Sequence, residues 1–122
     1  MIITKPKHCN LCGGDVIHTS NAAIYGKEYG SGKCYLCTEC GAYVGTHIPQ
    51  PEKAMGILAD ARMREKKKEC HAIFDKMWSN GKERRNLYKK LAKEMNMKLE
   101  DCHFGYMDIQ DLEMALYLIK RW

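Results

Sequence analysis

Two cysteine pairs with matching spacing are the residues best suited to chemistry in this sequence. The first pair lies in "CNLCGG" (9–14) and the second in "CTECG" (37–41). In both, a glycine directly follows the second cysteine, where it can adopt the positive φ that turns the chain back around a metal. The spacing predicts one tetrahedral metal site. Its expected ligands are Cys9, Cys12, Cys37 and Cys40.

A third thiol, Cys34, forms an overlapping C-x-x-C pair with Cys37. That pair is followed by Thr38 and lacks the glycine, so we expect Cys34 to be an unligated thiol packed against the metal-binding unit. A spare-ligand role for Cys34, His8 or His47 is the alternative.

The expected metal is one structural Zn²⁺. Four thiolates close the coordination shell and leave no position for the water that a catalytic zinc needs. The N-terminal half has few large aliphatic residues, so its small core is expected to need the metal to fold.

Short strands separated by Asn, Gly and Ser lie between and after the cysteine pairs. Strands are predicted at 15–18, 22–25, 33–37 and 42–47. Paired knuckles joined by such hairpins indicate a zinc ribbon.

The periodicity becomes helical after residue 56. Helices are predicted over 60–79, with Asp60 as N-cap and Asn80-Gly81 as the stop, over 83–96, and over 108–121. The expected fold class is α+β, with a four-cysteine zinc ribbon of short antiparallel hairpins (1–55) packed with a basic three-helix bundle (56–122) as one compact unit.

The net charge of +5 is concentrated in the centre of the chain. Residues 1–61 carry five Lys against five Asp/Glu, residues 62–98 carry thirteen Lys/Arg against five, and residues 99–122 carry two against five. A basic segment is typical of a nucleic-acid partner, and a solvated helix face is the alternative. The expected phosphate contacts are Arg62, Arg64, Lys66, Lys67, Arg84, Arg85, Lys89 and Lys90.

Two weaker nucleic-acid signals accompany this charge. Residues 87–105 faintly suggest a helix-turn-helix, although the gap before the next helix is long and bundle packing explains the pattern equally. Tyr25, Tyr29 and Tyr43 could stack on unpaired bases, or serve as packing residues.

The helical half also contains two Cys-His dipeptides, at 70–71 and 102–103. Asp75 lies four residues after His71 and is its natural partner. His71, Asp75 and His103 could converge on a metal or water as a hydrolase site. We favour core thiols and carboxylate-paired histidines, because no nucleophile or phosphate loop accompanies them.

No apolar leader or membrane-length run is present, and the cysteines suit a reducing compartment. A cytoplasmic protein without a membrane partner is therefore expected, and no small-molecule substrate is evident.

The sequence resembles a family of small zinc-finger-containing proteins frequent in bacteriophage and prophage genomes. The resemblance rests on "IYGKEYG" (24–30), "CYLCTECGAYVGTH" (34–47), "GILADARMREKKKECHAIFDKMWSNG" (56–81) and "DCHFGYMD" (101–108). It places the family's cysteine pairs on the four ligands above, its signature pair on His71 and Asp75, and its turn on residues 102–108. Cys70 and Arg62 depart from the family's usual alanine and acidic residue.

Three functions are compatible with these observations. The first is a phage-type accessory protein that binds nucleic acid through a basic helical face. The second is a protein-binding inhibitor of a host defence or transcription complex. The third is a metal-dependent hydrolase using His71, Asp75 and His103.

Overall fold

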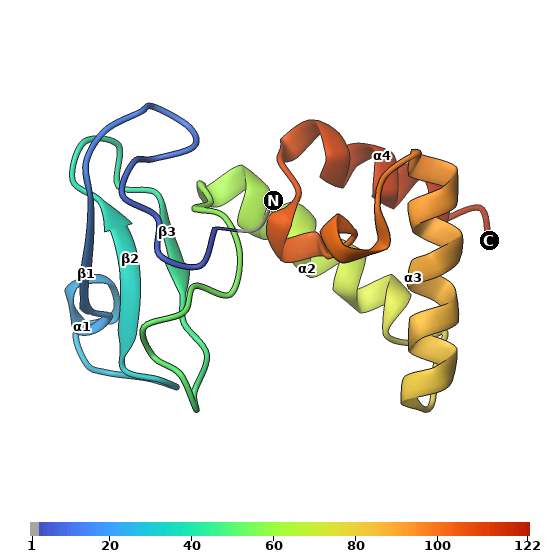
Figure 1. Ribbon diagram of the computed structural model, residues 1–122, viewed down its shortest axis with the longest axis horizontal. Coiled ribbons are helices and arrows are strands. Elements are labelled where there is room, and N and C mark those ends of the chain that lie inside the picture. The colour runs from blue at the N-terminus through green and yellow to red at the C-terminus, as the bar shows by residue number, and fades with distance from the viewer. Residues whose placement is uncertain (1–2) are drawn as a thin grey trace. The chain divides into compact units, whose positions relative to one another are not determined.

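The computed structural model describes residues 3–122 and divides into two compact units, Met1–Ala61 and Arg62–Trp122. Residues 1 and 2 of the predicted ribbon domain lie outside the described residues. The fold class is α+β, because the first unit contains a three-stranded antiparallel sheet and the second contains helices (Figure 1).

The sheet consists of β1 (Val16–Ser20), β2 (Lys33–Cys37) and β3 (Tyr43–Gly45) in the order β1-β2-β3. Val16 at the start of β1 is the register partner of Cys37 at the end of β2. The segments before β1 and after β2 therefore emerge at the same end of the sheet, and these two segments carry the cysteine pairs.

The strand predicted at 22–25 is wrong. These residues form a single helical turn, α1 (Ala22–Tyr25). The Ser20 hydroxyl accepts a hydrogen bond from the Ala22 N–H at 3.2 Å. The buried Asn21 side chain binds both the N–H and the carbonyl of Tyr29. These side-chain bonds favour a local turn over pairing in a sheet.

The core of the first unit is small and includes two of the predicted ligands. Leu58 and Ala54 are fully buried, and β2 and β3 contribute Tyr35 and Val44. Cys9 and Cys37 are 4% and 2% exposed within the same cluster. The apolar packing of this unit is thus continuous with its cysteine pairs.

The second unit is built on α2 (Ala61–Phe74), α3 (Gly81–Met95) and α4 (Ile109–Ile119). Asp108 caps α4, since its carboxylate accepts from the Asp111 N–H at 2.8 Å. None of the described helices is long and apolar enough to cross a membrane.

The predicted end of the first helix is wrong, because α2 ends at Phe74 and not near Ser79. The indole N–H of Trp78 donates to the Asp75 carboxylate at 3.1 Å and holds the following residues in a turn. Asn80, predicted as part of the stop signal, is the N-cap of α3.

A regular three-helix bundle is not confirmed. Two short 3-10 helices, η1 (Leu99–Asp101) and η2 (Phe104–Tyr106), connect α3 to α4. Phe104 is 1% exposed, and its ring centroid lies 5.3 Å from that of Phe74 and 5.9 Å from that of Tyr88. An aromatic residue from the connection therefore completes the core between the helices.

The start of α3 offers a test of this local structure. Asn80 Oδ1 accepts from the Glu83 N–H, and the Glu83 carboxylate accepts from both the Ser79 N–H and its hydroxyl. Asn80→Ala is expected to lower the free energy of unfolding of the helical unit by about 1 kcal/mol. Denaturant titration followed by fluorescence measures this, since Trp78 and Trp122 both lie in that unit.

Asn86→Ala is the matched control, because Asn86 is an exposed position inside the same helix. It should leave the midpoint unchanged or raise it slightly, through the better helix propensity of alanine. If the two variants lose the same free energy of unfolding, Asn80 does not stabilise α3 as an N-cap.

Candidate metal centre

The two cysteine pairs lie on two loops with the same backbone hydrogen bonds. The N–H groups of Cys9 and Cys37 each donate to a carbonyl five residues ahead, both at 2.8 Å. Gly13 and Gly41 each donate back to the carbonyl of the first cysteine, at 2.9 and 3.1 Å. Their φ angles, 76° and 81°, are left-handed, as the glycine positions predicted.

Backbone N–H groups point at the sulfurs in both loops. Leu11 N donates to Cys9 Sγ at 3.3 Å, and Gly14 N donates to Cys12 Sγ at 3.3 Å. In the second loop, the N–H groups of Glu39 and Cys40 both donate to Cys37 Sγ at 3.4 Å. Such donors stabilise negative charge on sulfur, which a metal ligand must carry.

The four sulfurs have the spacing of a tetrahedral zinc site. The Cys9–Cys40 and Cys12–Cys37 Sγ distances are 3.7 and 3.5 Å, and all four ligand atoms lie within 4.8 Å of one another. A regular tetrahedron with Zn–S bonds of about 2.3 Å has S–S edges of about 3.8 Å. The four cysteines therefore fit one structural zinc ion.

The ionisation of the thiols also suits a cation. The hydrogen bond from the Cys40 N–H lowers the pKa of Cys37 by more than burial raises it. Together with the hydrogen bond from the Glu39 N–H, it brings this pKa to about 6. The Ala42 N–H favours ionisation of Cys40, but burial and the three neighbouring sulfurs raise its pKa to about 12. Sulfurs this close cannot all carry charge by themselves, whereas a divalent ion at their centre stabilises four thiolates.

Two residues of the first loop have roles that the spacing did not predict. The amide of Asn10, between the cysteines, donates to the Leu58 carbonyl at 3.0 Å and accepts from the Leu58 N–H at 2.9 Å. A Cβ on Gly14 would lie 2.7 Å from Glu39 Cβ and 2.3 Å from its Cγ. The loops therefore touch at Gly14. A double glycine after the second cysteine was the only signal for this contact.

The remaining candidate ligands of this unit lie outside the cluster. Cys34 is 1% exposed in β2 opposite Gly45, and burial raises the pKa of its thiol. His8 forms an exposed ion pair with Asp15 at 3.8 Å, and His47 is exposed. Among residues 3–122, the four cysteines are the one group of three or more His, Cys, Asp or Glu side chains placed to share an ion.

In the helical unit, His71 and Asp75 pair as expected from their spacing, with Nδ1 and Oδ2 3.6 Å apart. His103 packs on the ring of Tyr88, at 5.2 Å between centroids. Within the described part of the chain the three residues form no metal cluster. Cys70 and Cys102 are fully buried, and burial raises the pKa of each to about 11, so both are core thiols.

The predicted phosphate contacts differ in their surroundings. On α2, Arg62 binds Glu113 at 2.6 Å and Lys66 lies 3.8 Å from Glu69. Burial, together with Arg64, lowers the pKa of Lys67. The α3 contacts are all exposed: Arg84, Arg85, Lys89 and Lys90.

The three tyrosines named as base-stacking candidates lie together around α1. Tyr25 meets Tyr29 and Tyr43 edge to face, at centroid distances of 5.6 and 6.2 Å. Tyr25 and Tyr29 are about half exposed. Their rings thus pack on one another first and offer only part of their surface to solvent.

Comparison with known families agrees with this site. A family described as a zinc-finger-containing domain matches residues 5–122, nearly the whole chain. The chain therefore belongs to that family. No curated protein and no solved structure matches the sequence.

Replacing single thiols tests the ligand set. Wild-type protein should hold one zinc per chain, and Cys37→Ser should hold none, because three sulfurs and a hydroxyl do not make the closed thiolate shell. Cys34→Ala should still hold one zinc per chain. Elemental analysis after gel filtration measures the zinc, and loss of zinc in both variants would contradict the assignment.

The contact between the loops gives a second test. Gly14→Ala should push the loops apart and weaken zinc binding about tenfold, as expected for overpacking. Gly45→Ala is the control, because the nearest atom to its new methyl is Met55 Sδ at 3.8 Å. Competition with a chromogenic chelator measures the zinc affinity of each variant. Equal zinc affinities would show that zinc binding does not depend on the close contact of the two loops at Gly14.

Proposed function

We propose that this zinc-finger-containing domain binds nucleic acid through one face of α3. That face, called here the α3 basic face, presents Lys82, Arg85, Lys89 and Lys93. The four residues recur at three- and four-residue steps, so their side chains follow one another along the same side of the helix.

The observation that carries the proposal is the absence of carboxylate partners on this face. Within residues 3–122, no ion pair joins the α3 basic face to Asp or Glu. Four neighbouring cations repel one another, and a row of phosphates relieves that repulsion. Release of counterions from the nucleic acid then supplies most of the affinity.

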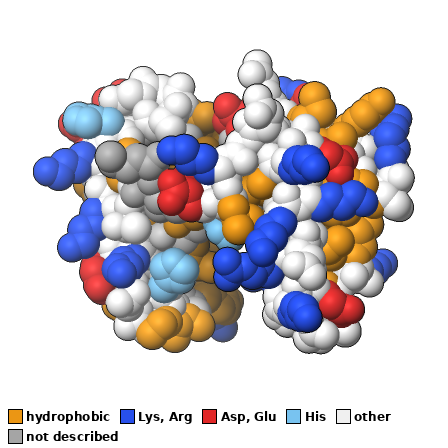
Figure 2. Space-filling model, turned by 45° about the vertical axis from the view of Figure 1, so that its right-hand side comes forward, with side chains coloured by type: hydrophobic (Ala, Val, Ile, Leu, Met, Phe, Trp, Pro, Cys, Tyr) orange, Lys and Arg blue, Asp and Glu red, His pale blue; other side chains and the backbone are white. Residues whose placement is uncertain are grey.

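The α2 cations are weaker candidates. A phosphate at Arg62 or Lys66 would have to displace Glu113 or Glu69. Figure 2 shows lysine and arginine side chains spread over the face in view, with carboxylates beside several of them. Exposure alone therefore does not identify a binding face, whereas a lack of neutralising partners favours α3. The zinc site has no open position and contributes structure to its own unit.

Salt dependence tests the proposal directly. Fluorescence anisotropy with single-stranded and duplex DNA probes should show affinity that falls steeply with salt. The double variant Arg85→Gln/Lys89→Gln should reduce the slope of log affinity against log salt by about 1.8 on duplex or about 1.4 on a single strand.

Lys5→Gln/Lys7→Gln is the matched control, because it removes two exposed charges from the other unit. It should leave the slope unchanged. If both double variants change the slope equally, the interaction depends on net charge alone and not on the α3 basic face. No binding at low salt would overturn the proposal and favour a docking surface for an acidic protein, the inhibitor function considered from the sequence.

A further inference from the structure

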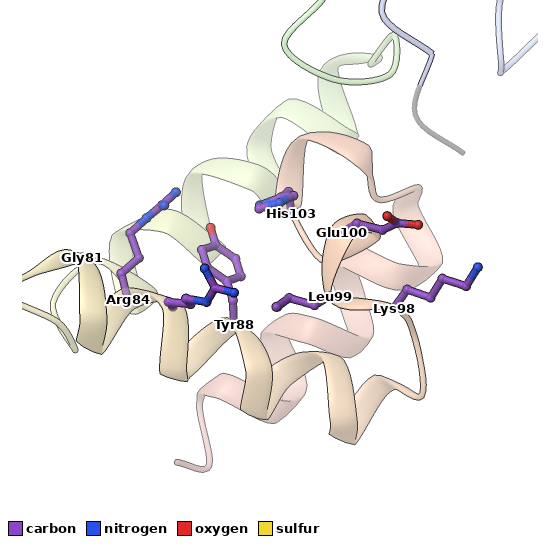
Figure 3. Close-up of a pocket in the computed structure, with 8 residues that line it drawn as sticks. Gly81, Arg84, Tyr88, Lys98, Leu99, Glu100 and His103 are labelled. Carbon is purple, nitrogen blue, oxygen red and sulfur yellow. The ribbon is translucent and has the colours of Figure 1, made fainter.

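The helical unit contains a pocket of about 740 Å³ between α3 and the connection that follows it. This volume is typical of small-molecule sites. Its lining comes from the first half of α3, with Arg84, Arg85 and Tyr88, and from the 98–103 segment, with Leu99, Glu100 and His103. In Figure 3, the side chains of Arg84 and Tyr88 extend from α3. His103 lies across from Tyr88, and Leu99 points toward Tyr88.

One side of the pocket is cationic and the other is flat and apolar. Arg84 and Arg85 are exposed on α3, whereas the side chain of Lys98, on the opposite rim, points away from them in Figure 3. The apolar side is formed by the half-buried His103 and Leu99 with Tyr88 behind, and the His103 and Tyr88 rings are 5.2 Å apart. A ligand that fits both sides carries an anionic group and a planar ring.

Arg84 is held in place by aromatic side chains. Its guanidinium carbon lies 5.0 Å from the ring centre of Tyr88 and 5.7 Å from that of Trp78. Trp78 in turn donates to Asp75 Oδ1, and Asp75 Oδ2 faces His71 at 3.6 Å. The histidine and aspartate singled out in the sequence thus belong to a chain of contacts that ends at this arginine.

The chemistry of the lining specifies the ligand class. Two adjacent arginines suit a phosphate, because guanidinium groups donate paired hydrogen bonds to its oxygens. The apolar wall suits the face of a base, and the ring nitrogens of His103 can hydrogen-bond its edge. Glu100 belongs to the rim, and its carboxylate points away from Arg84 and Tyr88 in Figure 3. A nucleoside monophosphate offers the phosphate, the base face and the base edge.

We propose that this pocket binds one nucleoside monophosphate unit, either as an unpaired nucleotide of a strand lying on the α3 basic face or as a free nucleotide. The strand-bound form rests on the proposed function, since Arg85 belongs to both surfaces. The free form does not. For the strand-bound form, the pocket predicts a preference for single strands over duplex, because a paired base cannot turn out of its stack without cost.

The test uses the zinc-loaded full chain with three probes: adenosine 5′-monophosphate, inorganic phosphate, and single-stranded or duplex DNA. NMR titration should shift the His103 and Arg84 signals with the nucleotide, and inorganic phosphate should bind at least about tenfold more weakly. His103→Phe and the exposed Arg84→Gln should each weaken nucleotide binding about tenfold. Neither should change zinc content or helical circular dichroism, and His103→Phe should leave the salt slope for DNA unchanged.

The outcomes separate the pocket from the basic face. Nucleotide binding at His103 without any DNA binding supports the pocket for a free nucleotide and overturns the proposed function. DNA binding that both pocket variants leave intact, with no nucleotide shift at His103, overturns the pocket and leaves the proposed function standing. Phosphate binding as tight as the nucleotide also overturns it, because the apolar wall then contributes nothing. If His103→Phe does not fold, Arg84→Gln alone decides.

Discussion

Charge on four clustered sulfurs is the constraint on which the N-terminal unit depends. The Cys9–Cys40 and Cys12–Cys37 sulfurs are 3.7 and 3.5 Å apart, too close for four thiolates without a cation between them. Backbone N–H groups stabilise part of the charge, and zinc stabilises the rest. Because Cys9 and Cys37 also belong to the small apolar core, the metal and the packing of this unit are coupled.

The helical unit has a different basis for its stability. Phe74, Tyr88 and Phe104 bury their rings against one another, and Leu91, Leu112 and Ile119 are fully buried around them. Among residues 3–122, no group of metal-binding side chains is clustered in this unit, and the cations of the α3 basic face are exposed to solvent. The same aromatic cluster borders the pocket, where Tyr88 contacts both His103 and Arg84. Packing and the proposed recognition therefore share residues.

The sequence was most informative where the chemistry is local. Ligand type, spacing and the glycines at 13 and 41 predicted the metal centre, because each knuckle is closed by hydrogen bonds within six residues. The secondary-structure prediction failed where side-chain hydrogen bonds override the hydrophobic periodicity of the sequence. Ser20 and Asn21 turned an expected strand into α1, and the Asp75–Trp78 bond ended α2 early. Phe104 and the pocket could not be predicted, since they depend on how the segment after α3 folds back onto it.

X-ray absorption at the zinc edge tests the central claim most directly, because it reports the ligands of the ion itself in the intact protein. Our account predicts four sulfur neighbours at about 2.3 Å and no nitrogen or oxygen in the first shell. It also predicts no change in that shell when nucleic acid is added, because the site is closed. A shell containing nitrogen, or an oxygen that responds to added ligand, would contradict a purely structural centre of four cysteines.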